Sequence, residues 1–257
     1  ARNLTGFQEL CEISETDPFY FVLVTHVTQG LFHERDQDFI KLNGRFVSPH
    51  SLISLPENIA FQLMGAAMEK NKDEAVLKDW EVALGDLTSR TQESRKLVKS
   101  VAHITDKEMV DILPIHPYAA LLLKHISSAF DSNQRSMFDF IKNDRGDEIK
   151  GFQWFIDNFG PEDDNPLLSV DMLWDFFYEK GKEYLAHDIR SILDYYNRAV
   201  NRRLDSDQKR VLKTVLLLQA ISQYAGDSVE LFIPNEKNLN NAFEGTDMEG
   251  SAARCAE

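Results

Sequence analysis

The chain has 257 residues, of which 43% are hydrophobic and 11% aromatic, and it carries a formal net charge of −14 at pH 7. This composition excludes a disordered chain and allows one large domain or two modest domains, each with its own core. The summed negative charge repels phosphate backbones and anionic lipid, so nucleic acid is an unfavourable partner.

The cysteines and the apolar runs indicate a cytoplasmic protein. Cys11 and Cys255 stand near opposite ends without a CxxC partner, which gives neither a disulfide framework nor a zinc site and suits a reducing compartment. No apolar run approaches the ~20 residues needed to cross a bilayer, and the first residues lack the layout of a signal peptide. Because the chain opens without Met and ends in DMEGSAARCAE, with no helix stop signal, we expect a fragment.

The first part of the chain predicts a helix, a strand and a hinge. Residues 4–15 place apolar side chains at helical spacing, and Asp17-Pro18 ends this helix. Residues 19–25 form a continuous run of aromatic and β-branched side chains, typical of a strand that is covered on both faces. Residues 34–42 predict a helix, and Asn43-Gly44 is a turn signal.

Helical patterns dominate after the hinge. Pro56-Glu57 begins a strong helix, because proline is tolerated in the first turn and an acid there faces the positive end of the dipole. Residues 71–110 are charged and helical with one apolar stripe, so they predict a peripheral helical segment. Residues 112–130 predict a buried helix, residues 135–142 a second helix, and residues 160–166 a loop.

The last part of the chain predicts a winged-helix-like or helical unit. Residues 173–178 are dense in aromatics and should be core, and residues 183–203 predict a helix. Asp205 or Ser206 offers an N-cap for the apolar helix that follows. Residues 231–243, LFIPNEKNLNNAF, predict a short extended piece followed by a helix, and this order indicates the winged-helix-like arrangement.

Common phosphate and metal motifs do not occur in the sequence. No GxxxxGK[ST] is found, so the chain has no phosphate-binding loop of its own, and HExxH, GxSxG, GxGxxG and EF-hand loops are missing too. His26 and His33 have no third ligand, and His187-Asp188 has no second histidine and carboxylate in a supporting motif. Asp163 and Asp164 lie in a loop too short for calcium. We therefore predict no metal site.

His26 and Arg45 are the first candidates for ligand contact. His26 closes the predicted strand, and open α/β sheets bind ligands at the carboxyl ends of parallel strands, but a hydrogen-bonded structural histidine explains it equally well. Arg45 follows the glycine hinge, which leaves a guanidinium standing off the body as an arginine finger must. On spacing alone, a surface arginine is the commoner explanation.

Arg135 is a further candidate, because it stands at a predicted helix start among aromatic side chains, two residues after Asn133. A cation there opposes the helix dipole, so it needs an anionic partner. A carboxylate in the core or a bound phosphate would serve. From the residues alone the carboxylate is favoured.

Several segments, taken in chain order, together resemble one protein family. They are an FxELxxxxE helix with a strand ending in His (7–26), NGRF (43–46), HPYAALLLKHISSAFDSNQRSMFDFI (116–141), LLSVDMLWDFF (167–177), RVLKTVLLLQAIS (210–222) and IPNEKNLNNAFEGTD (233–247). Together they resemble large bacterial P-loop ATPases of the AAA+/STAND type, which include ATP-binding proteins of phage-defence islands. The resemblance is strongest in 116–141 and covers most of the chain except about 71–110.

The resemblance implies the roles of the site residues. Thr25 or His26 would lie near the γ-phosphate as sensor, and Arg45 would be the finger that reaches the nucleotide of a neighbouring subunit or domain. The residues implied in the helical lid over the nucleotide are His116, Asn133 and Arg135.

The same resemblance implies that the Walker A and Walker B segments lie upstream of Ala1. ATP and Mg²⁺ are then expected for the full-length protein, and no cofactor or ATP hydrolysis for this chain alone. Ser132 and Gln134 stand where the family has Gln and Glu, so the polar corner of the lid is altered.

The sequence thus predicts a mainly α protein with four parts. They are a partial α/β P-loop ATPase core with few strands (1–72), a peripheral helical segment (73–110), a helical lid (111–160) and a truncated winged-helix-like or helical unit (161–257). The expected function is ATP binding and hydrolysis coupled to domain rearrangement, with the rest of the ATPase, neighbouring subunits or other proteins as partners and no membrane. The alternative is a stand-alone α-helical interaction or scaffold domain that binds no nucleotide.

Overall fold

The computed structural model describes residues 59–68, 70–126 and 137–252, together with Glu9, Glu12, Ile13, Thr16 and Cys255. The chain divides into two compact units, residues 1–55 and 56–257. In the first unit the four described residues are helical and exposed: Glu9, Glu12 and Ile13 agree with the helix predicted at 4–15, and Thr16 lies one residue beyond it. The strand predicted at 19–25 and the hinge at Asn43-Gly44 lie outside the described residues.

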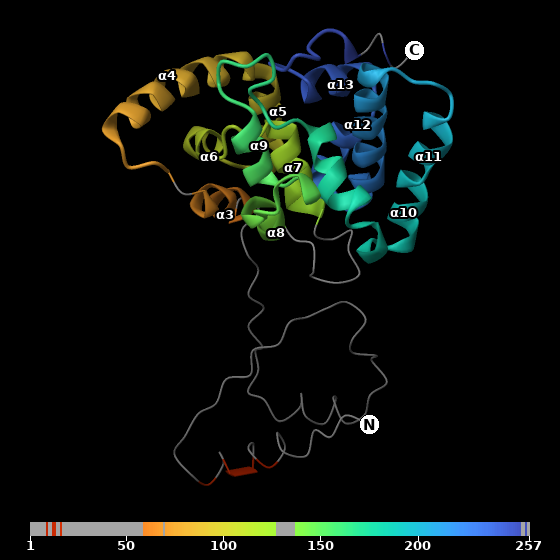
Figure 1. Ribbon diagram of the computed structural model, residues 1–257. Coiled ribbons are helices and arrows are strands. Elements are labelled where there is room, and N and C mark those ends of the chain that lie inside the picture. Colours follow the sequence, from red (N-terminus) through yellow and green to blue (C-terminus); the bar gives the residue numbers. More distant parts are fainter. Residues whose placement is uncertain are drawn as a thin grey trace. The chain divides into compact units, whose positions relative to one another are not determined.

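The second unit is α-helical, and its described residues form eleven α-helices (Figure 1). These helices are α3 (Ile59–Ala67), α4 (Glu74–Arg90), α5 (Gln92–Ala102), α6 (Asp106–Asp111), α7 (Pro117–Ile126), α8 (Met137–Lys142), α9 (Phe152–Asn158), α10 (His187–Leu193), α11 (Tyr195–Val200), α12 (Ser206–Ser222) and α13 (Glu236–Ala242). Short 3₁₀ turns connect them at η2 (Gly146–Glu148), η3 (Val170–Met172), η5 (Lys182–Tyr184) and η6 (Gly226–Phe232), and η4 (Asp175–Glu179) is a π-helix.

The prediction of a mainly α protein is confirmed, but no P-loop α/β core is seen in the described residues. The β pairing in this part of the chain is an isolated parallel bridge between Ile115 and Leu168. In this bridge the N–H of His116 donates to the carbonyl of Leu168, and the N–H of Leu168 donates to the carbonyl of Pro114, both at 3.0 Å.

Helix α7 lies at the centre of the core. Its residues from Tyr118 to Leu123 are completely buried, and it contacts α3, α5, α8, α12 and α13. Pro117 suits the first helical position because its missing N–H needs no partner there. Of the buried helix predicted for 112–130, the structure shows Pro117–Ile126, and residues 127–130 lie outside the described residues.

The predicted peripheral segment contains an edge helix and a core helix. Helix α4 lies at the edge of the unit in Figure 1 and buries only Ala83 and Leu87. Asp73 caps it by accepting the N–H of Ala75 at 2.9 Å. Helix α5 instead packs against α7. One hydrophobic core therefore runs through 73–110 and both ranges that follow it.

Two predictions for the last part of the chain are confirmed. Trp174, Phe177 and Tyr178 are at most 1% exposed, as expected for the aromatic core. Asp205 caps α12 in a reciprocal capping box with Gln208, as the N-cap prediction required.

Of the extended piece predicted at 231–233, only Ile233 has an extended backbone, and no strand of a winged-helix-like unit is found in residues 137–252. Leu231 and Phe232 end the 3₁₀ turn η6, where both are buried. Successive residues of a strand point to opposite faces, so one buried face would cover only one of the two. The amide of Asn238 donates to the carbonyls of Glu230 and Ile233, which satisfies groups that a partner strand would otherwise bind.

In the part of the chain that the structure describes, no helix has the length and apolar character required to cross a membrane.

Candidate functional site

The structure describes one of the six residues expected at a nucleotide site. Thr25, His26, Arg45, Asn133 and Arg135 lie outside the described residues, so their roles stay predictions. The sixth residue, His116, stands immediately before α7.

His116 is completely buried and bonded at both ring nitrogens. Nδ1 accepts the backbone N–H of Tyr118 at 3.2 Å and so caps α7. Nε2 lies 3.1 Å from the carbonyl oxygen of Glu244, and since a carbonyl only accepts, Nε2 carries the proton and donates it. Burial lowers the pKa of His116 to about 3, so the ring is neutral at pH 7. The structure gives His116 a positioning role in the helical core and leaves neither ring nitrogen for a nucleotide.

Glu244 connects α7 to α5. Its carboxylate accepts the backbone N–H groups of Glu93 at 3.0 Å and Ser94 at 2.7 Å, in the first turn of α5. Thr91, the residue at the N-cap position of α5, makes no side-chain capping bond. A carboxylate from about 150 positions away in the sequence therefore caps α5 and faces the positive end of its dipole.

Gly245 allows the chain to pass close to the end of α4. Its φ is +74°, and a Cβ at this position would lie 2.9 Å from Cβ and 3.0 Å from the carbonyl oxygen of Arg90. Glycine is required here for its conformation and for the close approach. It places Glu244 over α5 and Asp247 beside α12.

Arg210 of α12 also binds the segment that contains Glu244 and Gly245, through Asp247. Its Nε donates to Asp171 at 2.9 Å, and its Nη atoms donate to both carboxylate oxygens of Asp247 at 2.5 and 2.9 Å. Asp171 is 7% exposed and also accepts the hydroxyl of Ser169 at 2.5 Å. Burial alone lowers the pKa of Arg210, but the two carboxylates outweigh it, so the guanidinium stays charged. This planar, bidentate geometry is one that lysine could not reproduce.

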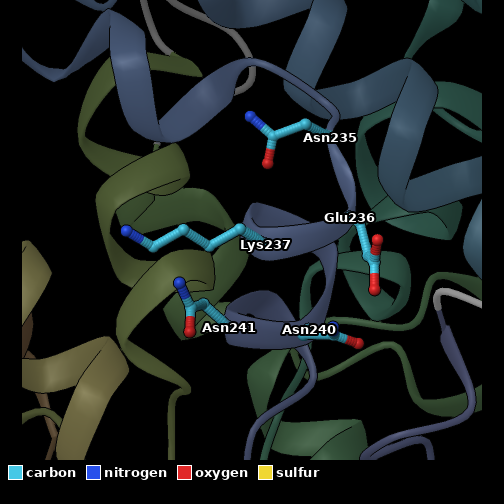
Figure 2. Close-up of a pocket in the computed structure, with 5 residues that line it drawn as sticks. All are labelled: Asn235, Glu236, Lys237, Asn240 and Asn241. Carbon is cyan, nitrogen blue, oxygen red and sulfur yellow. The ribbon is translucent and has the colours of Figure 1, made fainter.

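A polar hollow of about 640 Å³ lies along α13. In Figure 2, Lys237 and Asn241 point to one side of the helix and Glu236 and Asn240 to the other, as residues four apart on a helix do. With Asn235 these side chains supply three amides, one acid and one amine. Small-molecule sites are mostly apolar, so this surface is better suited to hydrogen bonding with another macromolecule.

A second hollow, of about 500 Å³, lies between α3 and α6. Lys70 and Lys107 both bind Asp111, at 3.3 and 2.5 Å, and the bond to Lys107 is the main cause of the lowered pKa of Asp111. The two lysines thus share one carboxylate. No buried polar group points to a particular ligand there.

Within the described ranges, no group of three His, Cys, Asp or Glu side chains is arranged to hold a metal ion. Asp188, from the dipeptide His187-Asp188, accepts the amide of Gln223 at 2.5 Å and the hydroxyl of Tyr224 at 3.3 Å. Asp163 accepts the N–H of Gly160 at 2.6 Å and so closes the loop at 160–166. Both aspartates have structural partners.

The sequence patterns predicted no role for four residues of these contacts: Asp171, Arg210, Glu244 and Asp247. All four lie in segments that carry the family resemblance. The available sequence signal for these contacts was the glycine that lies between two acidic residues in EGTD, Glu244–Asp247. It indicates a tight turn that presents carboxylates, but not what they bind.

The fold and these contacts define an α-helical domain whose helix ends are joined by exposed and partly buried polar contacts. Comparisons with protein-family models, with curated proteins and with solved structures gave no match.

Proposed function

We propose that this chain is the part of an AAA+/STAND-like P-loop ATPase that follows the Walker B strand, and that it supplies an arginine finger and a helical lid. The support is the resemblance in 116–141 together with the packing of the helices in that range. Helices α7 and α8 contact each other, and Phe140 and Ile141 of α8 are at most 5% exposed. Residues 127–136, which contain Asn133 and Arg135, are bounded on both sides by helices of one core.

In this proposal the chain supplies positioning and positive charge. Phosphoryl transfer requires neutralisation of charge on the γ-phosphate, and an arginine finger is worth roughly 10³ to 10⁵ in turnover. Arg45 has this role, Thr25 or His26 senses the γ-phosphate, and Asn133 and Arg135 contact nucleotide from the lid. A Walker A loop and magnesium-binding carboxylates come from elsewhere in the polypeptide, so this chain alone does not hydrolyse ATP.

The helical core suits the transmission of nucleotide state as a rigid-body movement. Because α5, α7 and α12 share one core and are joined by Glu244 and Arg210, these helices move as one body. Nucleotide turnover then changes the arrangement of this unit with respect to its partners. Bacterial phage defence is the setting that the resemblance implies.

The second candidate function is an α-helical scaffold that binds protein and no nucleotide. His116 favours it, because both ring nitrogens are bonded within the core. The amide-rich surface along α13 favours it too, because its groups suit a protein partner.

Two measurements separate the candidates. The coding sequence upstream of Ala1 supports the ATPase if it encodes GxxxxGK[ST] and an acid-tipped strand, and supports the scaffold if a start codon stands there. MgATP at concentrations well below about 1 mM should raise the unfolding temperature of the longer polypeptide and leave that of the 257-residue chain unchanged. No shift for a polypeptide that carries the loop overturns the proposal.

A further inference from the structure

Arg95 is a buried cation with few hydrogen bonds. It lies on the buried face of α5 and is 9% exposed. Nη1 reaches the carbonyl oxygen of Thr88 at 3.4 Å, and Nε has no partner among the described residues. Its carboxylate neighbour is Asp106, whose Oδ1 lies 3.8 Å from Nη2. A buried guanidinium normally has short bonds to an anion, so this arrangement leaves much of its donor capacity unused.

Asp106 is shared with a second cation and is open to solvent. The same oxygen that faces Arg95 lies 2.5 Å from Nζ of Lys99, and the side chain of Asp106 is 76% exposed. The bond to Lys99 keeps the pKa of Asp106 below its ordinary value, so the carboxylate stays ionised. Two cations therefore face one exposed carboxylate.

Three features of Arg95, Lys99 and Asp106 determine which ligand they can bind. Arg95 and Lys99 lie one turn apart on α5, so both can reach one anion. Their donors exceed what one carboxylate oxygen can accept. Asp106, at the exposed start of α6, can rotate into water without uncovering the core. The nearby carboxylate of Glu244 is bonded to two backbone N–H groups.

We propose that Arg95 and Lys99 form a binding site for a phosphate group, and that Asp106 serves as its exchangeable internal counter-ion. A tetrahedral oxyanion offers several oxygens at once, whereas Asp106 presents a single oxygen to both cations. Binding is weak, with a dissociation constant of about 1 mM, because the net charge of the chain opposes anions. This site is independent of the proposed ATPase function.

The test is titration of the 257-residue chain with inorganic phosphate at constant ionic strength, followed by phosphorus NMR and by the unfolding temperature. At about ten times the dissociation constant, phosphate should raise the unfolding temperature by about 3 °C over sodium chloride. Asp106→Asn removes the competing anion and should tighten binding about tenfold. Lys99→Gln should weaken it about tenfold. Lys107→Gln, which alters an 83% exposed lysine paired with Asp111, is the matched control and should bind as the wild-type chain does.

The outcomes are distinct. Equal effects of phosphate and chloride, or equal phosphate affinity in the Asp106→Asn, Lys99→Gln and wild-type chains, overturn the proposal. A second arm compares ADP without Mg²⁺ at the same concentrations. Similar affinity for ADP and phosphate supports a site for the phosphate group itself, and affinity for ADP at least tenfold higher, lost in Lys99→Gln, identifies a nucleotide as its source.

Discussion

The imidazole of His116 lies 3.1 Å from the carbonyl oxygen of Glu244, although 128 positions separate the two residues in the sequence. The side chain of Glu244 continues the connection to the first turn of α5. One short segment thus connects the N-termini of α5 and α7. Substitutions at His116 and at Gly245, the residue after Glu244, therefore test this part of the fold directly.

His116 should make stability depend on pH. Its pKa is lowered from 6.5 to about 3 in the folded chain, so between these values the unfolded chain binds the extra proton. The unfolding free energy must therefore fall as the pH falls below about 6.5, by about 2 kcal/mol from pH 7 to pH 5. Urea unfolding at a series of pH values measures this slope.

His116→Asn supplies the control for this slope. Asparagine can still cap α7, but it does not titrate, so the variant should be less stable at pH 7 and should lack the added loss between pH 7 and pH 5. Other groups titrate alike in both chains and cancel in the difference. Identical pH profiles would show that His116 is not buried as a neutral ring.

Removing Arg210 should destabilise the chain strongly. Arg210→Met leaves the buried Asp171 without its cation and should cost about 3 to 5 kcal/mol, whereas Asp171→Asn combined with Arg210→Met should cost clearly less than the sum of the two single changes. A double-mutant cycle by urea unfolding measures the coupling. Additive effects would mean that the two side chains do not interact in solution.

Gly245 and Gly250 form a matched pair, because both have positive φ, +74° and +70°. Alanine at Gly250 meets open space and should cost about 1 kcal/mol for the backbone alone, whereas alanine at Gly245 also meets Arg90 and should cost at least about 1 kcal/mol more. Thermal unfolding of both variants gives the comparison. Equal costs would place Arg90 farther from Gly245 than the structure has it.

Gly85 is a position where alanine should stabilise the chain and not destabilise it. It lies inside α4, and a Cβ there meets nothing within 4 Å. Gly85→Ala should therefore stabilise the chain by about 0.5 to 1 kcal/mol through helix propensity and the lower entropy of the unfolded chain. A lower unfolding temperature for this variant would indicate that residue 85 is not in a regular helix.

Local signals were sufficient for most elements of the fold. The capping residue Asp205, the buried run that became α7 and the aromatic residues at 173–178 each depend on neighbours in the sequence, so pattern and propensity find them. The apolar run at 231–233 predicts an extended piece, whereas Asn238 and the core select a 3₁₀ turn for Leu231 and Phe232. Tertiary contacts override propensity in such short runs.

The polar contacts between helices were not predictable from periodicity. Glu244 caps a helix from 150 positions away, and Arg210 meets acids 39 and 37 positions away on either side. Their pairing depends on where the helices pack, which one sequence does not encode in any repeating pattern. For His116 the resemblance implies a place in the lid, and the structure shows both of its ring nitrogens bonded inside the core.

The most direct test of the proposed function is steady-state ATP turnover by the full-length protein with Arg45→Ala, beside Arg202→Ala as a control at an exposed arginine. The proposal predicts that Arg45→Ala keeps nucleotide affinity and loses turnover by a factor of about 10³ or more, while Arg202→Ala is unchanged. Unchanged turnover in Arg45→Ala would contradict the arginine-finger role and favour the scaffold.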